Sequence, residues 1–137
     1  MKIAVEADED EAVHKAVIDG LVAFNREAAG LERGKKLVIA VRDDDGAVVG
    51  GVCGRVAADS AYLDLVYLDA SRRGTGIGRA MMQAAENEAR RLGAGHAWLY
   101  TMSFQARPFY EKLGYKSVGE MPFMGGKHRY YFMSKDL

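Results

Sequence analysis

The chain has one cysteine and two prolines in 137 residues, and its 19 basic residues are balanced by 19 acidic ones. A single cysteine excludes a disulfide framework and a multi-cysteine zinc site, and it is typical of a reducing compartment. Without net charge, no overall field draws the protein to nucleic acid or to an anionic membrane. No apolar run approaches ~18 residues, and the N-terminus turns acidic before a signal-peptide core could form. We therefore expect a cytoplasmic protein with neither a nucleic-acid nor a membrane partner.

The chain also lacks repeats and proline-rich linkers, so nothing divides it into parts. Its length suits one hydrophobic core, and we expect a single domain over residues 1–137. The histidines are His14, His96 and His128, which are too far apart in sequence to suggest one metal site. No metal is therefore expected.

Hydrophobic periodicity predicts a short strand at 2–6 and a helix at 8–29. The helix has its apolar residues at core spacing and an expected interruption near Gly20. Its acidic start at 8–11 suits the positive end of a helix dipole. The apolar residues of this helix are Val13, Val17, Leu21 and Phe24.

The rest of the chain reads as strands with two interspersed helices, which indicates a mixed sheet covered on both faces. A hairpin turn is expected at 43–46, where Asp-Gly follows two acidic residues. Strands are predicted at 37–41, 47–56, 61–68, 96–102, 116–121 and 129–134, and helices at 77–92 and 106–113. The longer of these helices has an apolar stripe of Ile77, Ala80, Met81, Ala84, Ala85, Ala89 and Leu92, with Glu86 among the polar residues opposite.

A basic, glycine-rich turn joins the strand at 61–68 to the helix that follows it. Gly74, Gly76 and Gly78 remove the Cβ atoms that would keep a ligand from the backbone. The first N–H groups of the helix have no intrahelical partner, and together with the helix dipole they favour phosphate. The turn therefore predicts an anion-binding site.

The spacing of this turn argues against two nucleotide sites. A dinucleotide fingerprint beginning at Gly74 needs a glycine where Arg79 stands, and an acidic residue about 20 positions on. A P-loop needs Gly-Lys-Ser/Thr after four spacers, which no window supplies. The turn does fit Arg73-x-x-Gly76-x-Gly78, and this pattern resembles the acyl-CoA signature of the GNAT superfamily of N-acetyltransferases.

A second segment, Gln105-Ala-Arg-Pro-Phe-Tyr-Glu-Lys-Leu-Gly-Tyr115, is similar to another signature of the same superfamily. The two motifs lie in the family's order and separation, and the resemblance covers roughly residues 37–135. It implies a three-layer αβα sandwich with a mixed, mostly antiparallel central sheet. In that fold two parallel strands splay apart and acyl-CoA inserts between them, which places 61–68 and 96–102 on either side of the gap.

The resemblance implies acetyl-CoA as acetyl donor and assigns its contacts. The pyrophosphate should lie on the backbone N–H groups of Gly74, Thr75, Gly76, Ile77, Gly78 and Arg79. Thr75 is expected to add a hydroxyl donor, and Arg73 to shape the loop and bind the cofactor from it. The alternative is that Arg73 is a solvated loop charge. The pantetheine arm should run along the backbone of Val66, Tyr67 and Leu68 like an extra strand. Where the family often has asparagine this chain has Ser103, and Gln105 is expected to compensate.

Acetyl transfer to an amine needs a neutral amine, a stabilised oxyanion and a proton for the leaving thiolate. Tyr110 matches the family tyrosine that donates to the sulfur, and a phenol keeps its proton at neutral pH; otherwise it is a core aromatic. By period-two alternation Tyr62, Asp64 and Val66 share one face, on which Asp64 is the only acid. Asp64 is therefore a base or water relay, unless it is structural and solvent takes the proton. The oxyanion is expected on a backbone N–H near 66–68.

The acceptor is the least determined part of the site. Tyr62 and His128 are the expected substrate contacts, and the acceptor is a small-molecule or peptide amine, acetylated by direct attack in a ternary complex. A homodimer through the C-terminal strands is a further hypothesis from the resemblance. The alternatives are an acyl-CoA-binding module without catalysis and, more distantly, a nucleotide-binding enzyme.

Overall fold

The computed structural model describes residues 1–6 and 10–137, which form two compact units, residues 1–33 and 34–137. The first unit contains α1 (Glu11–Ala29), capped by the Asp10 carboxylate, which accepts a hydrogen bond from the Ala12 N–H at 2.9 Å. The acidic start thus caps a helix as predicted, although residues 8 and 9 lie outside the described residues. The helix is continuous through Gly20, and residues 2–6 form no strand, so both of those expectations were wrong.

The apolar stripe of α1 has no packing partner among the described residues of its own unit. A helix buries such a stripe only against another layer, and the first unit contains no second helix or strand among its described residues. The side chains of the stripe are Val13, Val17, Leu21 and Phe24.

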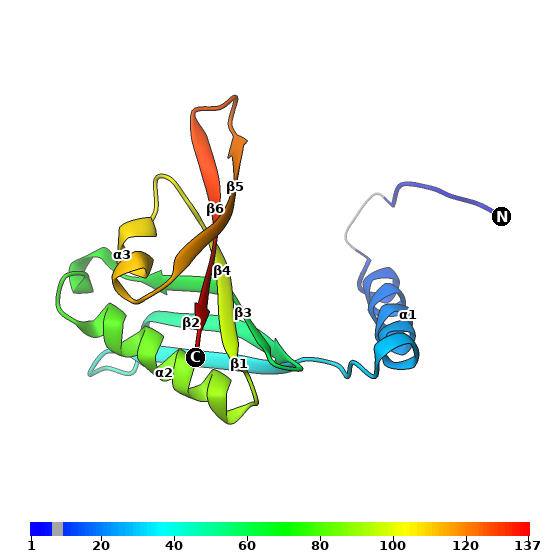
Figure 1. Cartoon of the computed structure of the whole chain (residues 1–137), viewed down its shortest axis with the longest axis horizontal. Coiled ribbons are helices and arrows are strands. Elements are labelled where there is room, and N and C mark those ends of the chain that lie inside the picture. The colour runs from blue at the N-terminus through cyan, green and yellow to red at the C-terminus, as the bar shows by residue number, and fades with distance from the viewer. Residues whose placement is uncertain (7–9) are drawn as a thin grey trace. The chain divides into compact units, whose positions relative to one another are not determined.

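The second unit is a six-stranded sheet in the order β1-β2-β3-β4-β6-β5, with every neighbouring pair antiparallel except β3 and β4 (Figure 1). This confirms the prediction of a mixed, mostly antiparallel sheet with one parallel pair. The strands are β1 (Lys35–Arg42), β2 (Val48–Ala57), β3 (Ser60–Leu68), β4 (His96–Met102), β5 (Lys116–Phe123) and β6 (His128–Asp136). The helices are η1 (Ala70–Arg72), α2 (Ile77–Arg91) and α3 (Arg107–Lys112).

The turn between β1 and β2 is held by its own side chains. The Asp43 carboxylate accepts hydrogen bonds from the N–H groups of Asp45 at 3.0 Å and Ala47 at 2.9 Å. Gly46 has a φ of +83°, which L-residues with a side chain rarely adopt. The predicted hairpin is confirmed.

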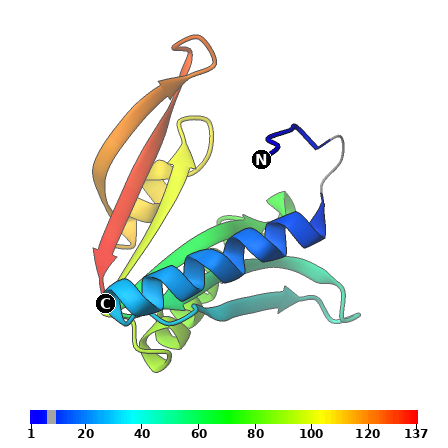
Figure 2. The same ribbon diagram turned by 90° about the vertical axis from the view of Figure 1, so that its right-hand side faces the viewer.

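The two parallel strands stay together for only three residue pairs. Ser60 pairs with His96, Ala61 with Ala97 and Tyr62 with Trp98, and no later residues of β3 and β4 pair. Figure 2 shows β1–β3 diverging from the half of the sheet formed by β4, β6 and β5. The expected splay is thus present, and it begins immediately after Tyr62.

One hydrophobic core unites α2, α3 and the sheet. α2 packs against β1 and β2, and α3 carries Tyr110 into the same core. The apolar stripe of α2 was placed slightly wrongly, because Met82 and Glu86 are buried whereas Ala80 and Ala84 are exposed. A long methionine fills core volume better than alanine, so the helix rotates to bury it.

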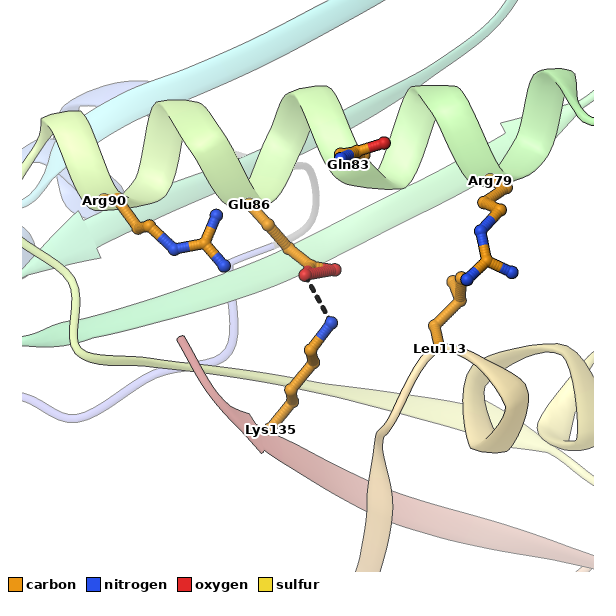
Figure 3. A pocket seen from close by; sticks show the side chains of 6 residues that line it. All are labelled: Arg79, Gln83, Glu86, Arg90, Leu113 and Lys135. Carbon is orange, nitrogen blue, oxygen red and sulfur yellow. Dashed lines mark hydrogen bonds and ion pairs between the residues drawn. The ribbon is translucent and has the colours of Figure 1, made fainter.

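Glu86 is only 5% exposed and is paired with a cation from β6. The Lys135 ammonium on β6 lies 2.6 Å from the Glu86 carboxylate (Figure 3). The Tyr115 hydroxyl donates to the other oxygen of that carboxylate at 3.4 Å. The pair borders a polar hollow of about 200 Å³ that is also lined by Arg79, Gln83, Arg90 and Leu113. The Glu86 carboxylate therefore connects α2 to β6 through Lys135, and to the segment after α3 through Tyr115.

We predict that Glu86→Ala destabilises the protein by about 3–5 kcal/mol, because it leaves the Lys135 charge half-buried without its partner. The matched control is Glu88→Ala, on the same helix and paired with Arg91 at the surface. Exposed ion pairs contribute little, so this control should cost much less. Urea unfolding measures both variants, and equal losses would contradict a structural role for Glu86.

Candidate active site

The divergence of β3 and β4 opens a cleft of about 840 Å³, within the range of small-molecule sites. One wall is β3 from Leu63 to Leu68, and the other is the end of β4. The glycine loop and the start of α2 close one side, while the loop after β4 and α3 close another. All the sequence motifs that predicted a site therefore meet around one cavity.

The glycine loop has a backbone that only glycine adopts easily. Gly74 has a φ of +73° and Gly76 a φ of +87°. A Cβ added at Gly78 would lie 3.4 Å from the ring of Phe109, so Gly78 allows α2 to approach α3 closely. Two of the three glycines thus serve the turn, and the third serves helix packing.

No hydrogen bond within the described part of the chain uses the backbone N–H groups of residues 74–79. The first bond of α2 is donated by Ala80 to the Gly76 carbonyl at 3.1 Å. These free donors surround the N-terminal end of a 15-residue helix, where the dipole adds positive potential. The arrangement suits a phosphate or pyrophosphate group.

Arg73 and Thr75 hold the loop together. The Arg73 Nε donates to the Leu68 carbonyl at 3.0 Å, which fastens the loop to the end of β3. The Thr75 hydroxyl donates to the Arg72 carbonyl at 2.6 Å, so its proton is directed into the loop and not to a ligand. Of the two, only Arg73 lines the cleft.

Tyr110 lines the cleft although its side chain is almost wholly buried. Phe109 and Tyr115 pack edge-on against its ring, at centroid distances of 5.2 and 5.9 Å. Its hydroxyl makes no hydrogen bond to any described residue, and burial raises the pKa of Tyr110 to about 12. The structure thus provides a protonated phenol whose donor is free.

Asp64 lies at a β-bulge in β3. Gly54 pairs with Leu63 and Cys53 with Leu65, so Asp64 is the extra residue between them. The predicted alternation of Tyr62, Asp64 and Val66 is therefore wrong beyond Asp64, because a bulge shifts the following side chains to the other face. Asp64 itself is exposed and lines the cleft.

The predicted acceptor contacts lie outside the cleft lining. Tyr62 stacks on Trp98 at 4.1 Å where the strands part, and burial, with the nearby Asp64 carboxylate second, raises the pKa of Tyr62. The Ser103 hydroxyl lies 3.0 Å from Nδ1 of His128 and accepts from the Arg129 N–H at 3.2 Å. The hydrogen bonds of Ser103 thus connect the loop that follows β4 to the first residues of β6.

Gln105 lines the cleft as expected, but its side-chain oxygen is engaged by the Met102 N–H at 2.8 Å. Tyr100 and Phe104 also line the cleft, although neither was predicted as a site residue from the sequence. The aromatic alternation Trp98-x-Tyr100 was a signal for one exposed face of β4. The face of β4 that borders the cavity is set by the divergence of β3 and β4. The aromatic alternation carries no information about that divergence.

A row of free N–H groups at a helix N-terminus, opening into a cleft between splayed parallel strands, defines an acyl-CoA-dependent transferase. Residues 5–115 match the model of the acetyltransferase (GNAT) family, and the chain belongs to that family. It is an N-acetyltransferase, and enzymes of this family use acetyl-CoA.

The chain is similar to an acetyltransferase of Agrobacterium fabrum, with 35% identity over 112 residues and 82% of each chain covered. A crystal structure assigned to an acetyltransferase of Agrobacterium tumefaciens has a TM-score of 0.90 at 31% identity over 100% of both chains. A structure assigned to a streptothricin acetyltransferase of Bacillus anthracis, with acetyl coenzyme A bound, shares the fold at 17% identity. Its TM-score is 0.67, with 77% of this chain and 64% of that chain covered.

Among residues 1–6 and 10–137, no three histidine, cysteine, aspartate or glutamate side chains come together in a way that could hold a metal ion. Over the same residues, no helix is both long and apolar enough to cross a membrane.

The raised pKa of Tyr110 makes stability depend on pH. A phenol that ionises near pH 10 when unfolded and at about 12 when folded stabilises the fold below pH 10, and this contribution is lost as the pH rises from 10 to 12. We predict that the free energy of unfolding falls more steeply in the wild type than in Tyr110→Phe, by about 1 kcal/mol per pH unit between pH 10 and 11. Urea unfolding at several pH values measures this, and parallel curves would show that Tyr110 is not buried.

Proposed function

We propose that this protein transfers the acetyl group of acetyl-CoA to a primary amine of a small molecule or peptide, by direct attack in a ternary complex. The observation that carries the proposal is that one cleft contains both the free N–H row at 74–79 and the free hydroxyl of Tyr110. The first suits the phosphates of a coenzyme, and the second suits the leaving group of a thioester.

The residues around the cleft fit acetyl-CoA. The N–H groups of 74–79 receive the pyrophosphate, while Arg73 holds the loop that presents them. β3 has no strand partner on its β4 side after Tyr62, so its backbone from Leu63 to Leu68 is free to bond an extended pantetheine arm. When bound, acetyl-CoA supplies an electrophilic thioester carbonyl and a thiol leaving group.

The same free edge of β3 supports an oxyanion site. As the amine attacks, negative charge develops on the thioester oxygen, and a fixed N–H donor stabilises it at little reorganisation cost. The bulge at Asp64 redirects the backbone just before Val66–Leu68, where we place this donor. No side chain is required for the role.

Tyr110 is the proposed acid. The nitrogen–carbon bond forms, the carbon–sulfur bond breaks, and the departing sulfur takes the phenolic proton, which solvent then replaces. With a pKa of about 12 the phenol is protonated throughout the physiological range. A phenol this weak acts first as a hydrogen-bond donor to the sulfur, and its proton moves as negative charge accumulates there.

Asp64 is the proposed proton relay for the amine. Among the described residues it is the only acid that lines the cleft, and its carboxylate is exposed to water. A short aspartate side chain acts more readily through a water molecule than by direct contact. The alternative is that the ammonium loses its proton to solvent and Asp64 only positions it.

The cofactor assignment is tested with Gly76→Asp, which puts a side chain and a negative charge into the N–H row. We predict that it weakens acetyl-CoA binding at least tenfold in calorimetric titration, from a micromolar wild-type affinity. Gly46→Asp is the matched control, because Gly46 has nearly the same φ, +83° against +87°, but lies in the turn between β1 and β2. Equal binding by the wild type and both variants would exclude the loop as the phosphate site.

The acid is tested with Tyr110→Phe, which removes one oxygen from the cleft. We predict a fall in turnover of about 10²–10⁴-fold with unchanged acetyl-CoA affinity, because only proton donation is lost. Tyr115→Phe is the control, since that buried hydroxyl is bonded to Glu86 and does not line the cleft. Thiol release measures the rates, and full turnover by Tyr110→Phe would remove it from the mechanism.

A further inference from the structure

A continuous cluster of aromatic rings adjoins the cleft beyond the reach of the glycine loop. We call it the aromatic wall, and its members are Tyr100, Phe104, Phe123, His128, Tyr130 and Phe132. Phe123 stacks on Tyr130 at 4.2 Å, and Phe104 meets His128 edge-on at 4.9 Å. Tyr100 and Phe104 lie on both the wall and the cleft lining, so the two surfaces are contiguous.

The wall is accessible and has an apolar character. Phe104 is 56% exposed and Tyr100 41% exposed. Met121, opposite Tyr130 in the β5–β6 pair, extends the same face and is also exposed. Exposed apolar patches of this kind beside a cavity mark binding surfaces.

Charges are separated along the cleft. Its basic side chains, Arg73 and Arg79, lie at the glycine loop, whereas Asp64 is its only acid within residues 1–6 and 10–137. Asp64 is two residues after Tyr62 on β3, and Tyr62 stacks on Trp98, which shares one face of β4 with Tyr100 of the wall. The end of the cleft next to the wall therefore offers one carboxylate and several aromatic rings.

We infer that the acceptor is a monoamine with an aromatic body, an arylalkylamine by chemical class. This inference rests on the proposed function and names its substrate. The single ammonium lies at Asp64, and the ring of the acceptor packs on Tyr100 and Phe104. Aromatic rings gain from such packing beyond the burial of area, so the body of the amine contributes to binding.

A polyamine fits these residues less well. Several ammonium groups need several carboxylates, and the part of the chain that the structure describes contributes one to the cleft lining. An aliphatic amine satisfies Asp64 but leaves the rings uncovered.

The first experiment measures thiol release at saturating acetyl-CoA with 2-phenylethylamine, n-butylamine and spermidine. We expect kcat/KM for 2-phenylethylamine to exceed that for each of the other two at least tenfold. A rate with spermidine or n-butylamine that equals or exceeds it overturns the substrate class and leaves acetyl transfer intact. No thiol release with any amine, from protein that binds acetyl-CoA, counts against the proposed function and removes the basis of the inference.

The second experiment uses Phe104→Ala, which truncates an exposed loop ring and should leave the fold intact. We expect KM for 2-phenylethylamine to rise about tenfold, with kcat, acetyl-CoA affinity and KM for n-butylamine unchanged, and Phe104→Tyr to restore the wild-type KM. An unchanged KM overturns the role of the wall. If light scattering also shows that Phe104→Ala converts a wild-type dimer to a monomer, the wall binds a second copy of the chain instead.

Discussion

The early divergence of β3 and β4 is the constraint on which the site depends. Three residue pairs keep these parallel strands in register, and beyond Tyr62 and Trp98 each loses its partner. Unpaired strand edges are costly when buried and are therefore ready to bond a ligand. β6 secures β4 from its other side, and the Glu86–Lys135 pair ties that half of the sheet to α2. The cleft thus stays open because β4 is paired with β6 on the side away from β3, and β6 is held to α2 by the Glu86–Lys135 pair.

The two ends of the cleft have opposite chemistry. One end has free N–H groups, a helix N-terminus and Arg73, which together favour anions. The other has Asp64 and the aromatic wall, which favour a single cation with an apolar body. Tyr110 projects into the same cleft from α3 with a pKa raised by burial. In the proposed function, a donor bound by its phosphates and an acceptor bound by its amine would therefore meet without competing for the same residues.

Local patterns predicted much of the fold and part of the site. The glycine loop, the hairpin at Asp43–Gly46 and the splayed pair were predicted correctly, because each depends on a few neighbouring residues or on a motif that resembles a known family. The bulge at Asp64 was missed, since one extra residue in a strand leaves the composition of the strand unchanged. Glu86 was placed on the polar face because its partner, Lys135, lies 49 residues away in the sequence.

The sequence by itself predicted an anion-binding loop, because glycine backbone freedom and an unsatisfied helix N-terminus are properties of consecutive residues, and its motifs identified the family. The tertiary structure alone decided which side chains reach the cleft. Ser103 and His128 were candidates by position along the chain, yet their mutual hydrogen bond clasps the loop after β4 to β6. Tyr100 and Phe104 were ordinary aromatics in the sequence, and they became cleft residues because β4 turns away from β3. Orientation of this kind arises from long-range strand pairing and packing, which no local pattern records.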